Sequence, residues 1–198
     1  MIDFKNNIEL IDLGLPSGNL WADRNIGADS PERKGLYYAW GEIEGFTSEE
    51  VKTKVRRFTW SQYKAKHIAF DLTAENDVAR ARLGENYHIP TKEDFEELLE
   101  NCDSSITYNY KGTMVAGRVL TSKINGNSIF LPCTGRCAYS SLYGASDYGL
   151  YWTSSCDLIS NAWVLFFYYR TPKLDSGIRS FGRVVRAVYN SHNNFILY

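Results

Sequence analysis

Four cysteines are the residues of this 198-residue chain with the most reactive side chains: Cys102, Cys133, Cys137 and Cys156. Cys133 and Cys137 lie four positions apart, which does not match the CxxC spacing of many zinc and redox sites. The chain holds only three histidines, without a paired ligand spacing, so neither a metal site nor a cofactor is predicted. The cysteines are expected to behave as small buried apolar side chains, with a disulfide from Cys102 or Cys156 left open.

Other catalytic patterns are missing from the sequence. There is no GxSxG, HExxH, Walker loop or GxGxxG after a strand. Ser154 and His88 could be combined with an aspartate into a triad, but no spacing places them together. The carboxylates of residues 91–100 are typical of a solvated helix face. No catalytic residue is therefore predicted, and the chain is expected not to be an enzyme.

Charge and composition restrict the partners. The formal net charge is −1, so the excess of basic residues that nucleic-acid binding requires is missing. The basic run Lys52–Arg57 follows two glutamates and is interpreted as a solvated charged segment. No apolar run is long enough to insert into a membrane, and the first ten residues do not predict a signal peptide. The aromatic content of 15% suits both a β-rich core and a recognition surface.

A helix over residues 91–102 is the clearest element. Thr91 is a candidate N-cap and Asp94 lies three residues later, as in a capping box. The apolar residues recur at helical spacing along one face: Phe95, Leu98, Leu99 and Cys102. A second helix is predicted over residues 73–83. Residues 42–70 are interpreted as an irregular insertion with a short helix near Ser48–Lys54.

The rest of the chain is predicted to be mostly β-structure. The expected strands are 8–13, 19–24, 35–41, 105–110, 114–121, 128–131, 149–155, 161–169 and 181–188. Asn125-Gly126-Asn127 is expected to form a turn because these residues tolerate positive φ. The last two strands are predicted to pair as a hairpin across the polar loop 171–180. The tail 189–198 is expected to pack on the domain or on a neighbouring subunit. Without a repeat or a linker, residues 1–198 are interpreted as one domain.

Several segments together are similar to a known family. They are Asp12-Leu13-Gly14-Leu15-Pro16-Ser17-Gly18, Trp21-Ala22, Asn25-Ile26-Gly27-Ala28, Tyr38-Ala39-Trp40-Gly41-Glu42, Ile89-Pro90-Thr91-Lys92-Glu93-Asp94-Phe95, Asn125-Gly126-Asn127-Ser128-Ile129-Phe130-Leu131-Pro132, Gly149-Leu150-Tyr151-Trp152-Thr153-Ser154-Ser155 and Val184-Val185-Arg186-Ala187-Val188. Over most of residues 9–188 the chain resembles Bacteroides-type proteins with the fold of formylglycine-generating enzymes, a variant of the C-type lectin fold. The resemblance implies an α+β fold with two helices around small antiparallel sheets and much irregular loop.

The same resemblance implies a non-catalytic ligand-binding protein. Some members resemble the variable proteins of diversity-generating retroelements, in which selected codons near the C-terminus are rewritten while the framework stays fixed. This implies that residues 136–186 form a variable ligand-binding region. The expected partner is a protein or surface glycan on a cell or phage, and the expected location is a phage particle or a bacterial cell surface. The oligomeric state stays open.

Strand alternation selects candidate ligand-binding side chains. By the family pattern Leu165 and Phe167 point inward, which leaves Phe166, Tyr168 and Arg170 on the outer face. The surrounding sequence is rich in Tyr, Ser and Asn, a mixture that antibody paratopes use. The predicted ligand-binding residues are Tyr139, Ser141, Tyr143, Ser146, Tyr148, Asp157, Ser160, Asn161, Trp163, Phe166, Tyr168, Arg170, Arg179 and Phe181. The alternative is that residues 162–169 form a central strand buried on both faces.

Two other functions are kept as alternatives. One is a surface adhesin or structural assembly subunit whose C-terminal strands pair with another chain. The other is a cysteine-dependent oxidase of the formylglycine-generating type, which would need two thiolates meeting in an open pocket. Calcium-dependent sugar recognition is not expected, because neither Glu-Pro-Asn nor Gln-Pro-Asp occurs in the sequence. A structural calcium ion is left open.

Overall fold

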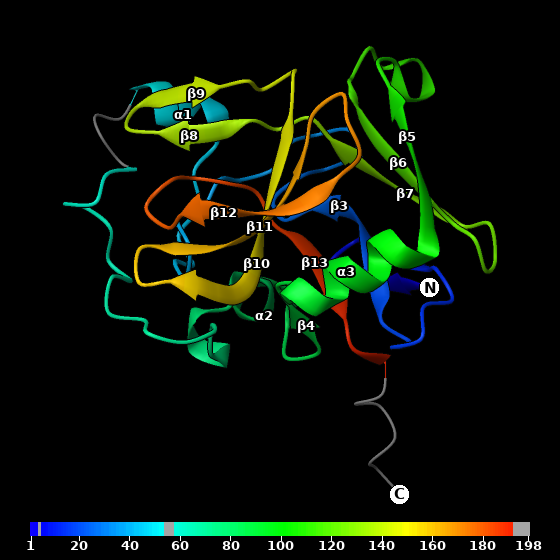
Figure 1. The fold of residues 1–198 in the computed structure, drawn as a ribbon, viewed down its shortest axis with the longest axis horizontal. Coiled ribbons are helices and arrows are strands. Elements are labelled where there is room, and N and C mark those ends of the chain that lie inside the picture. Colours follow the sequence, from blue (N-terminus) through cyan, green and yellow to red (C-terminus); the bar gives the residue numbers. More distant parts are fainter. Residues whose placement is uncertain (4, 54–57, 192–198) are drawn as a thin grey trace, which may run out of the picture.

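The computed structural model of the chain describes residues 1–3, 5–53 and 58–191. It is a mixed α+β structure with mostly antiparallel sheets and a few short helices (Figure 1). The α-helices are α1 (Ser48–Thr53), α2 (Val78–Leu83) and α3 (Lys92–Asn101), and the 3-10 turns are η1 (Ala74–Asn76) and η2 (Tyr110–Gly112). None of the helices in the described residues has the length and apolar character needed to span a membrane.

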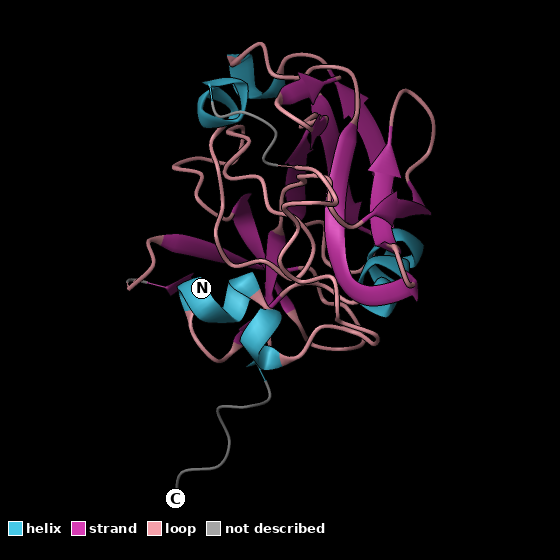
Figure 2. Cartoon of the chain, turned by 90° about the vertical axis from the view of Figure 1, so that its left-hand side faces the viewer, coloured by secondary structure: helices cyan, strands magenta, loops and turns pink. Residues whose placement is uncertain are grey.

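The strands of the described residues form four sheets. The five-stranded sheet has the order β1 (Ile2–Asp3), β2 (Ile8–Asp12), β3 (Leu20–Asn25), β13 (Arg186–Tyr189) and β4 (Tyr87–His88). Two three-stranded sheets contain β5 (Cys102–Thr107), β6 (Gly117–Ser122) and β7 (Ser128–Pro132), and β10 (Gly149–Leu158), β11 (Asn161–Phe167) and β12 (Lys173–Ile178). A two-stranded ribbon joins β8 (Arg136–Ala138) to β9 (Ser141–Tyr143). Loops make up much of the side seen in Figure 2.

The predicted capping box of α3 is confirmed. The Thr91 hydroxyl accepts a hydrogen bond from the Asp94 amide at 3.0 Å, and the Asp94 carboxylate accepts one from the Thr91 amide at 2.8 Å. Phe95 and Leu98 are buried, as the apolar stripe requires. The helix ends at Asn101 because β5 begins at Cys102.

Two other local predictions are corrected, and the short helix in residues 42–70 is confirmed. The expected helix 73–83 is divided, because the Asp77 carboxylate caps α2 by accepting hydrogen bonds from the amides of Ala79 and Arg80. The expected strand 35–41 forms only isolated bridges, at Tyr37 and Tyr38. Residues 42–70 contain α1 at the predicted place. Parts of two predictions, residues 54–57 of the basic run and residues 192–198 of the tail, lie outside the described residues.

The predicted hairpin between 161–169 and 181–188 is wrong. Residues 173–178, expected to be a loop, form β12, which pairs with β11 in a register that places Val164 opposite Asp175. β13 instead pairs with β3 and β4 in another sheet. The sequence of β12, KLDSGI, is too polar to be recognised as a strand by its hydrophobic pattern.

The β10–β11–β12 sheet lies between two apolar clusters. Leu165 and Phe167 of β11 pack into the cluster on one side, while Ala162 and Val164 pack into the cluster on the other. The alternative of burial on both faces is therefore correct for these four residues. Phe166 is only half-buried. A sheet fixed from both sides gives a stiff base for the side chains at its open end.

Candidate ligand-binding site

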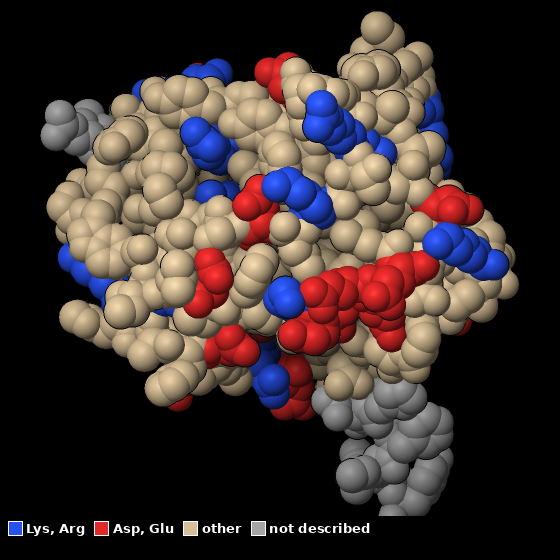
Figure 3. All heavy atoms as spheres, viewed as in Figure 1, with Lys and Arg blue, Asp and Glu red and all other residues tan. Residues whose placement is uncertain are grey.

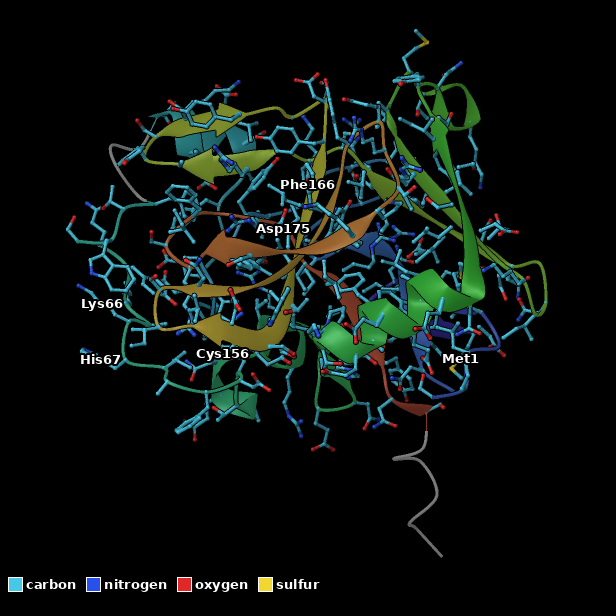
Figure 4. All side chains as sticks on the ribbon, viewed as in Figure 1. Met1, Lys66, His67, Cys156, Phe166 and Asp175 are labelled. Atoms are coloured by element: carbon cyan, nitrogen blue, oxygen red, sulfur yellow. The ribbon has the colours of Figure 1, made fainter. Side chains whose placement is uncertain are left out.

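An open pocket of about 530 Å³ lies on the face of the sheet that carries Phe166. Leu150 and Phe166 are cross-strand neighbours and Val164 follows on the same face, so these side chains form the apolar part of its surface. Figure 4 shows Phe166 and Asp175 near one another, between β12 and the β8–β9 ribbon. Another hollow, of about 820 Å³, is lined only by non-aromatic residues of 27–48 and 113–115. The aromatic pocket is the better candidate for ligand binding.

Aromatic side chains from two segments form one wall of the pocket. The rings of Tyr148 and Phe166 lie 6.1 Å apart between centroids. Tyr168 lines the same pocket and is 42% exposed. The buried Arg118 guanidinium donates hydrogen bonds to the carbonyl oxygens of Tyr168 and Arg170, which fixes the turn after β11. Tyr168 is therefore an exposed side chain on a restrained backbone.

Charged and polar groups complete the lining. Arg136 is exposed, and its guanidinium lies 5.7 Å from the ring of Phe181. Asp175 forms an ion pair of 2.8 Å with Lys173. Burial alone would raise the pKa of Asp175, but the hydrogen bonds from Lys173 and the Ser176 amide lower it below its ordinary value. Figure 3 shows that Asp and Glu gather in another place, over α3.

Arg183 also lines the pocket, although it is only 3% exposed. Its guanidinium lies 4.1 Å from the centroid of the Trp152 ring, and Nη1 donates a hydrogen bond to the Ile178 carbonyl at 2.9 Å. Burial, and next the positive charge of Arg136, lower the pKa of Arg183 to about 9. The group therefore remains a cation at neutral pH.

Three of the predicted residues line the pocket: Tyr148, Phe166 and Tyr168. Four others lie on or beside the β8–β9 ribbon: Tyr139, Ser141, Tyr143 and Phe181. Tyr139 and Tyr143 are exposed there, and Phe181 is half-buried against Tyr139. Ser146 is exposed and lines a smaller hollow that also contains Tyr168.

Three predicted residues form a polar group at the turn between β10 and β11. The Ser176 hydroxyl donates to the Asp157 carboxylate at 2.5 Å and accepts a hydrogen bond from the Asn161 amide nitrogen at 2.8 Å. Ser160 is exposed beside them. Ser176 also lines the pocket, so it connects this polar group to the pocket.

Three of the predicted residues lie elsewhere. Trp163 is half-buried on the opposite face of β11, with the Lys92 ammonium 5.0 Å from its ring centroid. Arg170 is exposed and lies beside the ring of Tyr169. The prediction for Arg179 is wrong because its side chain is fully buried.

The buried side chain of Arg179 contacts other segments of the fold. It donates hydrogen bonds to the carbonyl oxygens of Asn161 and Ile68, and its guanidinium lies 4.1 Å from the Trp40 ring centroid. These contacts connect the 42–70 segment to β11. They occupy the groups that a ligand would need, so Arg179 cannot contribute to the predicted surface.

Five polar residues that line the pocket are not among the ligand-binding residues predicted from the sequence: Arg136, Asp147, Asp175, Ser176 and Arg183. Asp175 and Ser176 were missed because β12 was taken for a loop. Arg183 had a signal, since it is a charged residue in the otherwise apolar run FGRVV, where a charge is expected to be paired or functional.

The four cysteines differ in their burial. All four are free thiols; Cys102, Cys133 and Cys137 are buried. Burial raises the pKa of Cys133 to about 11 and that of Cys137 to about 12, opposite to the change that makes a thiol nucleophilic. Cys156 is partly exposed, at the end of β10 away from Phe166 (Figure 4). In the described residues, no three His, Cys, Asp or Glu side chains are grouped to hold a metal ion.

No family model, no curated protein and no solved structure matches this chain. The pocket and the residues that form it are therefore the features from which a function can be inferred.

Proposed function

We propose that the chain is a non-catalytic ligand-binding protein of the diversity-generating retroelement variable-protein type. In this proposal its α+β structure is a C-type-lectin-like fold of the formylglycine-generating variant, and it is displayed on a phage particle or a bacterial surface. The supporting observation is the open pocket lined by Tyr148, Phe166 and Tyr168. It lies on the β10–β11–β12 sheet, which packs against an apolar cluster on each side.

Such a site suits changes of ligand without changes of fold. Tyrosine and phenylalanine give large contact areas and lose little conformational entropy on binding. Tyr139, Tyr143 and Tyr168 are exposed, so their replacement removes little packing from the core. The deep neighbours Leu165 and Phe167 keep the sheet in place. Variation of exposed side chains in 136–186 would therefore alter binding, while the framework preserves stability.

The adhesin or assembly alternative requires a strand edge that another chain can use. β11 is paired with β10 on one edge and with β12 on the other, so residues 161–167 have no free edge. β12 lies at the edge of this sheet and carries the charged pair Lys173 and Asp175, which disfavours pairing between edges. Light scattering decides this alternative: an obligate oligomer with residues 161–170 in its contact would support it.

Cell binding tests the ligand-binding function. Fluorescently labelled protein is incubated with a panel of bacterial and host cells, and saturable binding is measured by flow cytometry. We expect Phe166→Ala and Tyr168→Ala to keep the circular dichroism spectrum and to lose binding. The matched control is Phe70→Ala, because Phe70 is 81% exposed and lies outside the pocket. Equal loss in the control, or no saturable binding of the wild-type protein to the panel, contradicts the proposal.

Flanking DNA tests the retroelement part separately. We expect a nearby reverse transcriptase gene and a near-copy of the codons for residues 136–186 that differs at adenines. Flanking DNA with neither feature would contradict diversification but not ligand binding. The oxidase alternative is decided by assaying oxidation of a cysteine peptide with the wild-type protein and with Cys156→Ser.

A further inference from the structure

Two buried arginines differ in how well their hydrogen-bonding groups are satisfied. Arg186 donates from Nε to Asn25, from Nη1 to the carbonyl oxygens of Ala22 and Asp23, and from Nη2 to the Phe130 carbonyl. Arg183 donates only from Nη1, to Ile178. Its Nε is buried without a partner. Buried donors of a cation are normally satisfied, so the unsatisfied Nε and Nη2 of Arg183 need an explanation.

The charge of Arg183 is also uncompensated. No Asp or Glu of the described residues forms an ion pair with it. Arg136, a second cation, lines the same pocket, and the carboxylate of Asp175 is already paired with Lys173. A buried cation without a counter-charge is costly, and an anion that enters the pocket would remove this cost.

The surroundings of Arg183 keep its guanidinium in one orientation. One face lies over Trp152. Gly177 lies close by, where a Cβ atom would come within 2.8 Å of Nη2. Nη1 is held by Ile178 and Nε is covered by protein atoms, so Nη2 is the donor that a ligand in the pocket can reach. A carboxylate oxygen can accept a charge-assisted hydrogen bond from it.

We propose that the pocket binds the carboxylate of an acidic sugar on Nη2 of Arg183. This deepens the proposed function and rests on it. Arg136 adds positive charge at the rim, and the rings of Tyr148 and Phe166 contact the apolar face of the sugar. Asp147, Asp175 and Ser176, which line the same pocket, accept hydrogen bonds from its hydroxyl groups.

The chemistry of the lining favours this ligand over other anions. The two aspartates oppose a doubly charged phosphate more strongly than a singly charged carboxylate. The carboxylates of Asp147 and Asp175 can also accept hydrogen bonds from the ligand, and a sugar ring supplies several donors from its hydroxyls. An acidic peptide supplies the carboxylate but fewer donors near it. A sugar acid is therefore the ligand class that satisfies most of the pocket.

The test follows the Nε–H signals of protein labelled with ¹⁵N-arginine by NMR. The probes are glucuronate and N-acetylneuraminate, with methyl glucoside as the neutral match and N-acetylaspartate amide as the peptide match. We expect both acidic sugars to shift the Arg183 Nε–H signal saturably and methyl glucoside to leave it unchanged. Arg183→Lys should weaken binding about tenfold or more, because a lysine ammonium cannot reproduce the donor position that the Trp152 ring and the Ile178 carbonyl fix for Nη2.

Arg33→Lys is the matched control, since Arg33 is an exposed arginine outside this pocket and its variant should bind like the wild type. If Arg183→Lys does not keep the wild-type circular dichroism spectrum, Arg136→Ala at the exposed rim replaces it and should weaken binding. No saturable shift with either acidic sugar, or equal binding by the pocket variants, overturns the proposal. Tighter binding of N-acetylaspartate amide than of both sugars overturns the sugar assignment. If the protein binds cells but neither acidic sugar shifts the Arg183 signal, the acidic-sugar inference is refuted and the proposed ligand-binding function is not.

Discussion

Phe166 and Phe167 are adjacent phenylalanines for which the structure predicts different effects of truncation. Phe167 is 1% exposed, and its ring lies 6.0 Å from that of Tyr151 between centroids. Phe166 is half-buried and lines the pocket, with Tyr148 on one side and the Lys173 ammonium 5.8 Å from its ring. Replacing each by alanine therefore removes core packing in one case and mainly pocket surface in the other.

The expected magnitudes follow from burial. Phe167→Ala leaves a cavity in the core and should lower the free energy of unfolding by about 3–5 kcal/mol. Phe166→Ala loses the burial of roughly half a ring, which corresponds to about 1–2 kcal/mol. In a chain of this size each kcal/mol lowers the melting temperature by about 2–4 °C. Phe167→Ala should thus melt roughly 10 °C below the wild type, and Phe166→Ala only a few degrees below it.

Urea unfolding followed by tryptophan fluorescence measures both variants, and the cell-binding assay is run on each at a temperature where it is folded. Phe166→Ala should lose cell binding while its free energy of unfolding stays near the wild-type value. Phe167→Ala should instead show a large decrease in the free energy of unfolding. Equal destabilisation by the two substitutions would refute the reasoning, because it would mean that Phe166 belongs to the core and not to an accessible pocket.

Three further predictions concern the framework. Burial alone would raise the pKa of Asp94, but hydrogen bonds from His88 and Thr91 lower it. The ionised Asp94 therefore stabilises the fold at any pH above the pKa that it has in the unfolded chain. This stabilisation is lost as the pH falls below about 4. The urea midpoint should fall with pH over this range in the wild type and less in Asp94→Asn; parallel curves would contradict this. Gly149→Ala would place a Cβ within 2.1 Å of the Phe167 ring, so it should cost about 1–3 kcal/mol in urea unfolding, and an unchanged midpoint would contradict that contact. Cys156, the partly exposed thiol, should react with a thiol reagent in the native protein before the three buried cysteines; rapid labelling that persists in Cys156→Ser would show that another thiol is accessible.

Local elements could be predicted from the sequence because their signals lie within a few residues. The capping box places Thr91 and Asp94 three positions apart, and the structure has α3 there. The turn Asn125-Gly126-Asn127 joins β6 to β7, and Gly126 has the positive φ that favours glycine. Of the candidate site, Tyr148 could be predicted from composition, and Phe166 and Tyr168 from strand alternation together with the inward positions that the family resemblance implies.

The pairing of the strands and the contacts of the buried arginines depend on segments that are distant in the sequence. β12 forms because its backbone completes the edge of β11, although its own side chains are mostly polar. Arg179 and Arg183 are four positions apart in a polar-to-apolar stretch, and their positions alone do not distinguish their environments. The first is hydrogen-bonded to Ile68, more than a hundred residues away, and the second stacks on Trp152 beside an open pocket.

The sequence by itself determined the capped helix α3, the turn between β6 and β7, and the aromatic character of the C-terminal third, because backbone propensity and side-chain type are local properties. Only the tertiary structure decided which charges are buried and that the Arg183 guanidinium lines the pocket with donors left unsatisfied. The physical reason is that burial and hydrogen-bond satisfaction depend on which distant segments meet around a side chain.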